Sequence, residues 1–188
     1  MTVTAETVET GIPGYEAAKW TIDPVHSEVG FSVRHMMVSK VRGRFTKFSG
    51  ELVTAPDPLE SLVHAEIDLS SIDTGQEQRD NHIRSADFFE VETYPTMTYT
   101  SRGIRLEDGE YVLDGDLTLK GVTRSVPLRL ELNGFGPDPY GGYRAGFTAT
   151  GEINRNDFNV SFNAPLANGG VVVAEKVQLQ LEIEAVRV

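Results

Sequence analysis

The sequence predicts an all-β fold, either a closed antiparallel barrel or a sandwich, with about eight or nine strands. Three observations lead to this prediction. Apolar and polar residues alternate with a period of two in most segments, turns rich in Gly, Pro and Asp separate these segments, and one polar stretch lacks the alternation. Closing an antiparallel sheet into a barrel covers its apolar face and removes its exposed edges. A single short helix could not cover a broad open sheet, which argues against a helix-backed sheet.

The length and composition exclude several classes of protein. The chain has 188 residues and a formal net charge of −11, and it contains no cysteine. Domains commonly contain about 100–200 residues, so we expect one domain. The negative charge argues against nucleic-acid binding, and the lack of cysteine excludes disulfides and thiol catalysis. The longest apolar run, Gly170 to Ala174, is far shorter than the roughly 20 residues of a transmembrane helix, so we expect no membrane span.

The first 18 residues differ from the rest of the chain. Residues 1–18 contain three Glu and no Lys or Arg, and Pro13-Gly14 lies near their end. We interpret them as a flexible acidic tail that precedes a barrel domain at residues 19–188. They lack the basic start and the apolar run of a secretory signal, so we expect a cytoplasmic protein.

The strands follow in chain order from the alternation and the turns. In the first long strand the apolar face runs from Val29 to His35, and Met36 to Val41 predicts a helical turn that leads to the next strand. An Asp108-Gly109 pair between two strand-like runs is a strong signal for a hairpin. The runs that predict the other strands are Val63–Leu69, Ile104–Leu106, Tyr111–Leu113, Leu117–Leu119, Val126–Asn133, Tyr143–Ile153 and Val177–Glu184.

The polar stretch from Gln76 to Phe89 predicts the one short helix, from about Glu77 to Ser85. Several polar groups lie close together on this helix, among them Asp80, His82 and Arg84. They are compatible with a solvated helix face. They are equally compatible with the rim of a pocket, where His82 and Arg84 would meet the polar head of a ligand.

Catalytic and metal motifs are weak. Asp23, His26 and Ser27 are the residue types of a hydrolase triad, and they lie within five residues of one another. Neighbouring residues of a strand point to opposite faces, so a turn set by Pro24 is the simpler interpretation. The four His are scattered without the spacing of a metal site, and no Gly-rich phosphate loop occurs. We therefore expect no metal and no cofactor.

The aromatic residues and one basic segment are the remaining candidates for a binding site. Lys40 to Arg44 is locally basic and predicts a solvated turn, or else a contact for an anionic head group. Aromatic side chains usually fill a core, but a barrel of about eight strands can also hold one small ligand. The aromatic residues on or beside predicted inward faces are Phe31, Phe45, Phe48, Phe88, Phe89, Tyr99, Phe147, Phe158 and Phe162.

Several motifs together resemble the YceI-like family, in the family's order over residues 19–188. They are Trp20–His35, Val41–Phe45, Ile72–Thr74, Arg79–Phe89, Tyr94-Pro95, Leu117–Thr123 and Ile153–Phe158. The resemblance implies an extended, lipocalin-like antiparallel barrel of eight strands with one short capping helix. It also implies a tunnel for a long polyisoprenoid chain, such as an isoprenoid quinone or a polyprenyl phosphate. A homodimer is implied as well, and no catalytic residue comes with the family.

We therefore expect a binding protein rather than an enzyme, which carries, stores or sequesters an isoprenoid-type lipid. Strand phase and the resemblance select eleven ligand-binding candidates: Phe31, Val33, Phe45, Phe88, Tyr99, Phe147 and Ile153 for the apolar chain, and His35, Arg44, His82 and Arg84 for the head group. Two alternatives stay open. One is a hydrolase that uses Asp23, His26 and Ser27. The other is an interaction module whose barrel is filled by its own side chains and whose acidic surface meets a basic partner.

Overall fold

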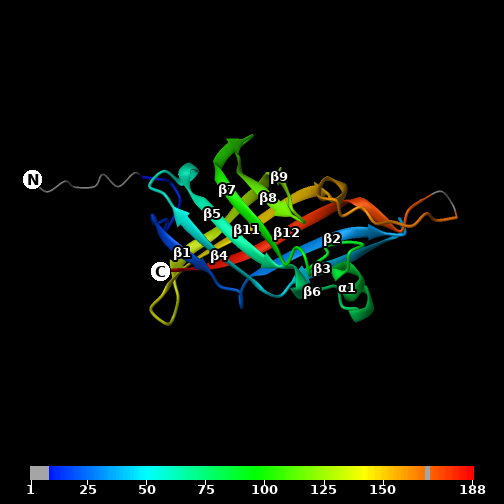
Figure 1. Cartoon of the computed structure of the whole chain (residues 1–188). Helices are drawn as coiled ribbons and strands as arrows, with labels where there is room; N and C mark the ends of the chain where they lie inside the picture. Colours follow the sequence, from blue (N-terminus) through cyan, green and yellow to red (C-terminus); the bar gives the residue numbers. More distant parts are fainter. Residues whose placement is uncertain (1–8, 168–169) are drawn as a thin grey trace, which may run out of the picture.

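Twelve β-strands and one α-helix make up most of the described chain, residues 9–167 and 170–188, in the computed structural model (Figure 1). The strands are β1 (Ala18–Ile22), β2 (Glu28–His35), β3 (Ser39–Phe45), β4 (Phe48–Thr54), β5 (Leu62–Asp68), β6 (Ile72–Asp73), β7 (Thr96–Glu107), β8 (Glu110–Leu119), β9 (Val122–Ser125), β10 (Leu128–Pro137), β11 (Tyr143–Asn154) and β12 (Val173–Arg187). The helix is α1 (Glu77–Arg84), and three short 3₁₀ helices are η1 (Pro58–Glu60), η2 (Leu69–Ser71) and η3 (Arg155–Phe158).

Eight of these strands close a ring. β1, β4, β5, β7, β8, β10, β11 and β12 each hydrogen-bond to the next strand in that order, and β12 returns to β1. All of these pairs are antiparallel. The prediction of an all-β fold with an eight-stranded antiparallel barrel and one short helix is therefore confirmed.

The long strand β12 extends the barrel beyond this ring because it pairs with two strands in succession. Near its C-terminal end Arg187 lies opposite Trp20 of β1, and at its start Val173 lies opposite His35 of β2. β3 then pairs with β2, and β6 pairs with β3. We call the end with α1 and the β2–β3 turn the α1 end, and the opposite end, where the C-terminus and the β10–β11 loop lie, the terminal end (Figure 1).

The β2–β3 connection differs from the prediction. The helical turn over Met36 to Val41 is wrong, because the turn covers only residues 36–38 and β3 begins at Ser39. The basic segment from Lys40 to Arg44 is a strand and not a solvated turn. Its alternation is hidden in the sequence because Gly43 takes an inward position. A Cβ atom there would lie 2.4 Å from the ring of Phe31, which covers the glycine.

Two local predictions are confirmed. Asp108 and Gly109 have φ angles of 51° and 80°, the left-handed conformation at both central positions that a tight hairpin between β7 and β8 requires. The predicted helix starts at Glu77 and ends at Arg84, one residue before the predicted end.

The part of the predicted tail that the structure describes packs on the terminal end of the barrel. The Tyr15 hydroxyl donates to the carbonyl of Ala55 at 2.6 Å, and the Tyr143 hydroxyl donates to the carbonyl of Gly14 at 2.5 Å. The carbonyl of Glu16 accepts from Thr54 Oγ1 at 2.6 Å. Residues 1–8 of that prediction lie outside the described residues. Within the described ranges, no helix has both the length and the apolar character needed to cross a membrane.

Candidate functional site

The inner faces of the strands enclose a cavity of about 820 Å³, which falls within the usual size range of small-molecule sites. It reaches from Tyr15 and Phe135 at the terminal end to His35 at the α1 end. On β12 its lining runs from Val173 to Ile183. Ten steps of about 3.3 Å give the cavity a length of roughly 33 Å along this strand, so it is a tunnel rather than a round pocket.

The tunnel wall is apolar along most of its length because each strand turns its aliphatic and aromatic residues inward. The charged and imidazole side chains of the wall gather at the α1 end, and they are Arg34, His35, Arg79, His82 and Arg155. No described Asp or Glu belongs to the wall. The tunnel therefore combines a long apolar section with a basic section at one end, in a chain whose formal net charge is −11.

Most of the predicted site residues lie along this tunnel. Phe31, Val33, His35, Phe45, His82, Phe88, Tyr99, Phe147 and Ile153 all belong to its lining. Arg44 and Arg84 do not. Arg44 lies 3.5 Å from Asp73 at the β3–β6 pair, and Arg84 donates to the carbonyls of Ser70 at 2.8 Å and Ile72 at 3.0 Å. Arg84 thus holds α1 against η2 and β6, and neither guanidinium belongs to the tunnel lining.

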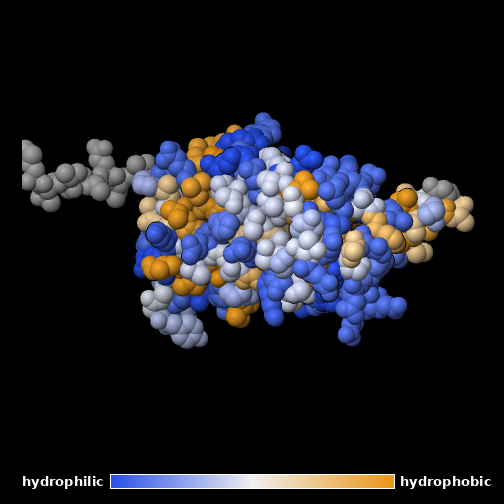
Figure 2. Space-filling model, in the orientation of Figure 1, coloured by the Kyte–Doolittle hydropathy of each residue, from blue (hydrophilic) through white to orange (hydrophobic). Residues whose placement is uncertain are grey.

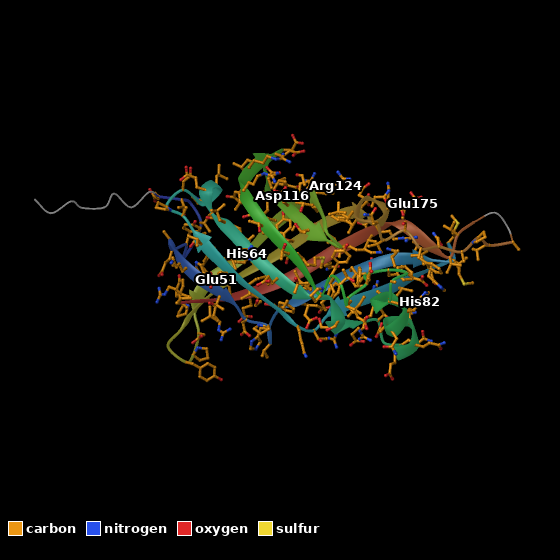
Figure 3. All side chains as sticks on the ribbon, viewed as in Figure 1. Glu51, His64, His82, Asp116, Arg124 and Glu175 are labelled. Atoms are coloured by element: carbon orange, nitrogen blue, oxygen red, sulfur yellow. The ribbon has the colours of Figure 1, made fainter. Side chains whose placement is uncertain are left out.

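Aromatic contacts close the tunnel at the α1 end. The His82 ring lies 5.1 Å from the ring of Phe88 and 5.0 Å from that of Phe162, both edge-on. Phe88 and Phe162 are 5.3 Å apart. His82 lies on α1 (Figure 3), and its Nε2 lies 2.7 Å from Asp87, which orients the imidazole. These contacts join α1 and its following turn to the segment after η3, so side-chain packing replaces strand pairing here.

Tyr99 lies in the middle of the tunnel, with its ring against Gly115. A Cβ atom at Gly115 would lie 2.5 Å from that ring. The Tyr99 hydroxyl donates to the carbonyl of Val126 at 2.8 Å. Burial raises the pKa of Tyr99, so the phenol stays neutral. The hydroxyl is therefore satisfied by the protein, and the ring presents an apolar surface to the tunnel.

Arg155 is a buried cation of the tunnel wall that the sequence predictions did not single out. Its side chain is 5% exposed, and its guanidinium donates to four backbone carbonyls. Nε donates to Ala174 at 2.8 Å, and the two terminal nitrogens donate to Val160, Phe162 and Val173 at 2.7, 2.9 and 3.2 Å. Burial lowers its pKa. Arg155 therefore ties the segment after η3 to the start of β12.

Arg79 and Tyr15 are among the other lining residues that were missed. Arg79 donates through Nε and Nη2 to the hydroxyl and carbonyl of Thr74, at 2.7 and 2.8 Å, and Tyr15 belongs to the predicted tail. Arg79 could have been predicted from the sequence, because it lies on the same polar helix as His82. For Arg155 the sequence carries no such signal, since its partners are carbonyls that the fold alone brings together.

The Asp23, His26 and Ser27 group does not form a triad. His26 Nδ1 lies 2.8 Å from Asp23 Oδ2, but Ser27 Oγ donates to the Glu184 carbonyl at 3.2 Å and accepts from the Glu184 amide at 2.9 Å. Arg144 Nη1 lies 2.9 Å from Asp23 and 2.7 Å from Glu184, and this ion pair lowers the pKa of Asp23. Asp23, His26 and Glu184 have the types and spacing of metal ligands, but this guanidinium takes the place of a cation.

The fold and the tunnel define a class of protein, the lipocalin-like barrels with an elongated apolar interior. The match to known sequences then names the family. The model of the YceI-like domain matches residues 20–185, and the chain belongs to this family. A UPF0312 protein of Photorhabdus laumondii is 41% identical over 174 residues, which cover 91% of this chain and 88% of that protein.

Solved structures of other proteins share the fold. That of BcnA from Burkholderia cenocepacia has a TM-score of 0.74 at 25% identity and covers 87% of this chain and 98% of that one. That of a polyisoprenoid binding domain from Saccharophagus degradans, described as implicated in plant cell wall breakdown, has a TM-score of 0.66 at 17% identity. The match covers 92% of this chain and 100% of that domain, and it shows that the two share a fold.

Proposed function

We propose that the protein binds one long isoprenoid-type lipid in its barrel and acts as a carrier, store or sequestering protein for it. The observation that carries this proposal is the apolar tunnel, which follows β12 for roughly 33 Å. Burying one CH₂ group contributes about 0.8 kcal/mol, so a chain of a few isoprene units gains a large gross free energy. The name of the Saccharophagus degradans domain, which shares the fold, points in the same direction.

The basic section indicates how the lipid is oriented. His35, His82 and Arg79 line the α1 end, and the rest of the tunnel offers mainly apolar surface. A quinone carbonyl or a phosphate accepts hydrogen bonds from such groups, whereas the prenyl chain gains from the apolar section. We therefore place the head group at the α1 end and the chain toward Phe147 and Phe135.

The cavity favours this binding function over the two alternatives. An interaction module with a filled barrel needs no tunnel of about 820 Å³. A hydrolase needs its serine hydroxyl close to the base, and here the Ser27 hydroxyl is engaged by the backbone of Glu184. The homodimer and the cytoplasmic location expected from the sequence stay predictions, which sedimentation and cell fractionation can test.

Two experiments test the proposed function. Native mass spectrometry of the purified protein, followed by solvent extraction, should detect one prenyl lipid for each chain. For titration, Trp20 is the only tryptophan, and its ring lies 5.8 Å from that of Phe135 in the tunnel wall, so a prenyl chain that reaches this end should change its fluorescence. A prenylated benzoquinone whose chain spans the tunnel should quench it with saturation. Benzoquinone without a tail is the control and should not saturate. Absence of both a co-purified lipid and saturable quenching would contradict the proposal.

A further inference from the structure

The α1 end carries a cluster of exposed apolar side chains, which we call the apolar tip. Its members are Met36, Met37 and Val38 of the β2–β3 turn, with Phe162 and Val171 of the segment between η3 and β12. Met37 is 62% exposed and Val38 is 81% exposed, so water covers most of their surface. Figure 2 shows hydrophobic surface on this protruding end, next to the hydrophilic side of the barrel.

The two segments of the apolar tip form one surface. The amide of Met36 donates to the carbonyl of Val172 at 2.7 Å, and the amide of Val172 donates to Ala164 at 3.1 Å. His35 lies opposite Val173 at the start of β12. The β2–β3 turn is thus fixed to the neighbouring segment by backbone hydrogen bonds, and the exposed side chains of both project from the same end.

The backbone conformation of the turn does not favour methionine. Met36 and Met37 have φ angles of 51° and 62°, in the left-handed region that Gly and Asn adopt most easily. A two-residue left-handed turn with exposed methionines therefore violates two local preferences, for conformation and for solvation. Such local violations are expected where a residue serves function rather than stability.

Positive charge lies behind the β2–β3 turn of the apolar tip. Arg34, Lys40 and Arg42 are exposed on β2 and β3 directly behind the turn. Residues 33–44 contain four basic residues and no acidic one, in a chain with a formal net charge of −11. This asymmetry favours a partner that is anionic at the level of the basic side chains and apolar beyond them. A second copy of the same tip would instead bring like charges together.

A lipid bilayer with anionic head groups has this arrangement, because its acyl layer lies directly below a negatively charged surface. The tip is also continuous with the tunnel, since Phe162 of the tip belongs to the tunnel lining. We propose that the apolar tip inserts into an anionic membrane surface and presents the α1 end of the tunnel to it. This inference rests on the proposed function for its purpose, since docking there would let a prenyl lipid pass between bilayer and tunnel.

The test is co-sedimentation of the full chain with vesicles of equal parts phosphatidylcholine and phosphatidylglycerol. The variant is Met36→Asn with Met37→Asn, because Asn adopts the left-handed conformation well and should preserve the turn. Together the two methionines expose about as much surface as one whole Met side chain, and this surface would be buried in the membrane. Without it, the variant should bind vesicles about ten- to a hundredfold more weakly. Neither methionine belongs to the tunnel lining, so quinone quenching of Trp20 should not change.

Tyr140 supplies the matched control. It is 91% exposed in the β10–β11 loop at the terminal end, and Tyr140→Ser should leave vesicle binding unchanged. Vesicles of phosphatidylcholine alone should bind the parent more weakly, because the basic side chains lose their partner. Failure of the parent to bind either vesicle, or equal binding by the parent and the double Asn variant, would overturn the docking proposal. A dimer that the double variant dissociates, without vesicle binding, would assign the tip to a second copy instead. Quenching of Trp20 without vesicle docking would leave the proposed function intact.

Discussion

Replacing Arg155 with Met tests whether the buried guanidinium holds the α1 end of the tunnel closed. Met has a similar length but donates no hydrogen bond. The carbonyls of Val160 and Ala174 then lose the partner that the structure describes for them. The carbonyl of Val173 keeps Asn163 Nδ2 at 2.7 Å, and Phe162 is exposed enough for water to replace Arg155. The carbonyls of Val160, which is buried, and of Ala174, which is partly buried, therefore decide the cost.

Each such acceptor costs about 1–3 kcal/mol, and removing a buried cation returns part of that cost, so we expect a net loss of about 3 kcal/mol. For a chain of this size, 1 kcal/mol shifts the Tm by about 2–4 °C, which gives a decrease of about 6–12 °C. Circular dichroism during heating measures it. Arg155→Lys keeps the charge but not the planar fork, and its Tm should lie between those of the parent and the Met variant.

Arg124→Met is the control for this prediction. Arg124 is exposed on β9 (Figure 3), and its Nε lies 3.5 Å from the carbonyl of Asp157, so its loss should change the free energy of unfolding by less than about 0.5 kcal/mol. The Arg155 variant should also release a bound quinone faster, because Phe162 loses its anchor. Equal Tm values for the Arg155→Met and Arg124→Met variants would refute the reasoning.

Three other substitutions separate binding from stability. Ala65→Phe places a ring in the tunnel and should weaken quinone quenching at least about tenfold, with a Tm within a few degrees of the parent's; unchanged quenching would argue against the tunnel as the site. Gly115→Ala pushes the ring of Tyr99 from its place and breaks a buried hydrogen bond, so denaturant titration should show a loss of about 1–3 kcal/mol. Arg144→Gln removes the ion pair that lowers the pKa of Asp23 in the folded state. That stabilisation is complete above the ordinary carboxyl pKa of about 3.9 and disappears as the pH falls. The Tm difference from the parent should therefore be largest near neutral pH and shrink in acid, and a constant difference would contradict this account.

The ring of strands was predictable because inward and outward positions alternate over long runs. Leu179 and Leu181 of β12 reach the tunnel by this alternation alone. The same rule also places Arg44 outside, next to the inward Phe45, and the basic character of the segment was given too much weight there. Gly43 hid the alternation of β3, because its inward position carries no apolar side chain to reveal the strand.

The contacts of Arg84 and Arg155 could not be predicted from local patterns. Arg84 bonds to carbonyls 12 and 14 residues away, and Arg155 bonds to carbonyls both close by and up to 19 residues away. An arginine that satisfies backbone carbonyls in the interior looks the same in a sequence as an exposed one. Such residues become visible only when the fold fixes which carbonyls lack a strand partner.

The interruption between β1 and β2 explains why the two ends of the tunnel are closed by different forces. The chain stops pairing with β12 at the end of β1 and resumes at the start of β2, and the five residues between them turn at Glu184. There the amide of Asp23 donates to the Glu184 carbonyl at 2.8 Å, and Ser27 bonds to the same residue. On one side of this interruption, β1 joins a ring of continuous hydrogen bonds. On the other side, the sheet ends at β6, and the rings of His82, Phe88 and Phe162 close the gap. Opening the ring would break several backbone hydrogen bonds at once, whereas moving these side chains breaks no backbone hydrogen bond and only the one between His82 and Asp87. The α1 end, where the basic side chains and the apolar tip lie, is therefore the end at which a lipid meets the lower barrier to entry.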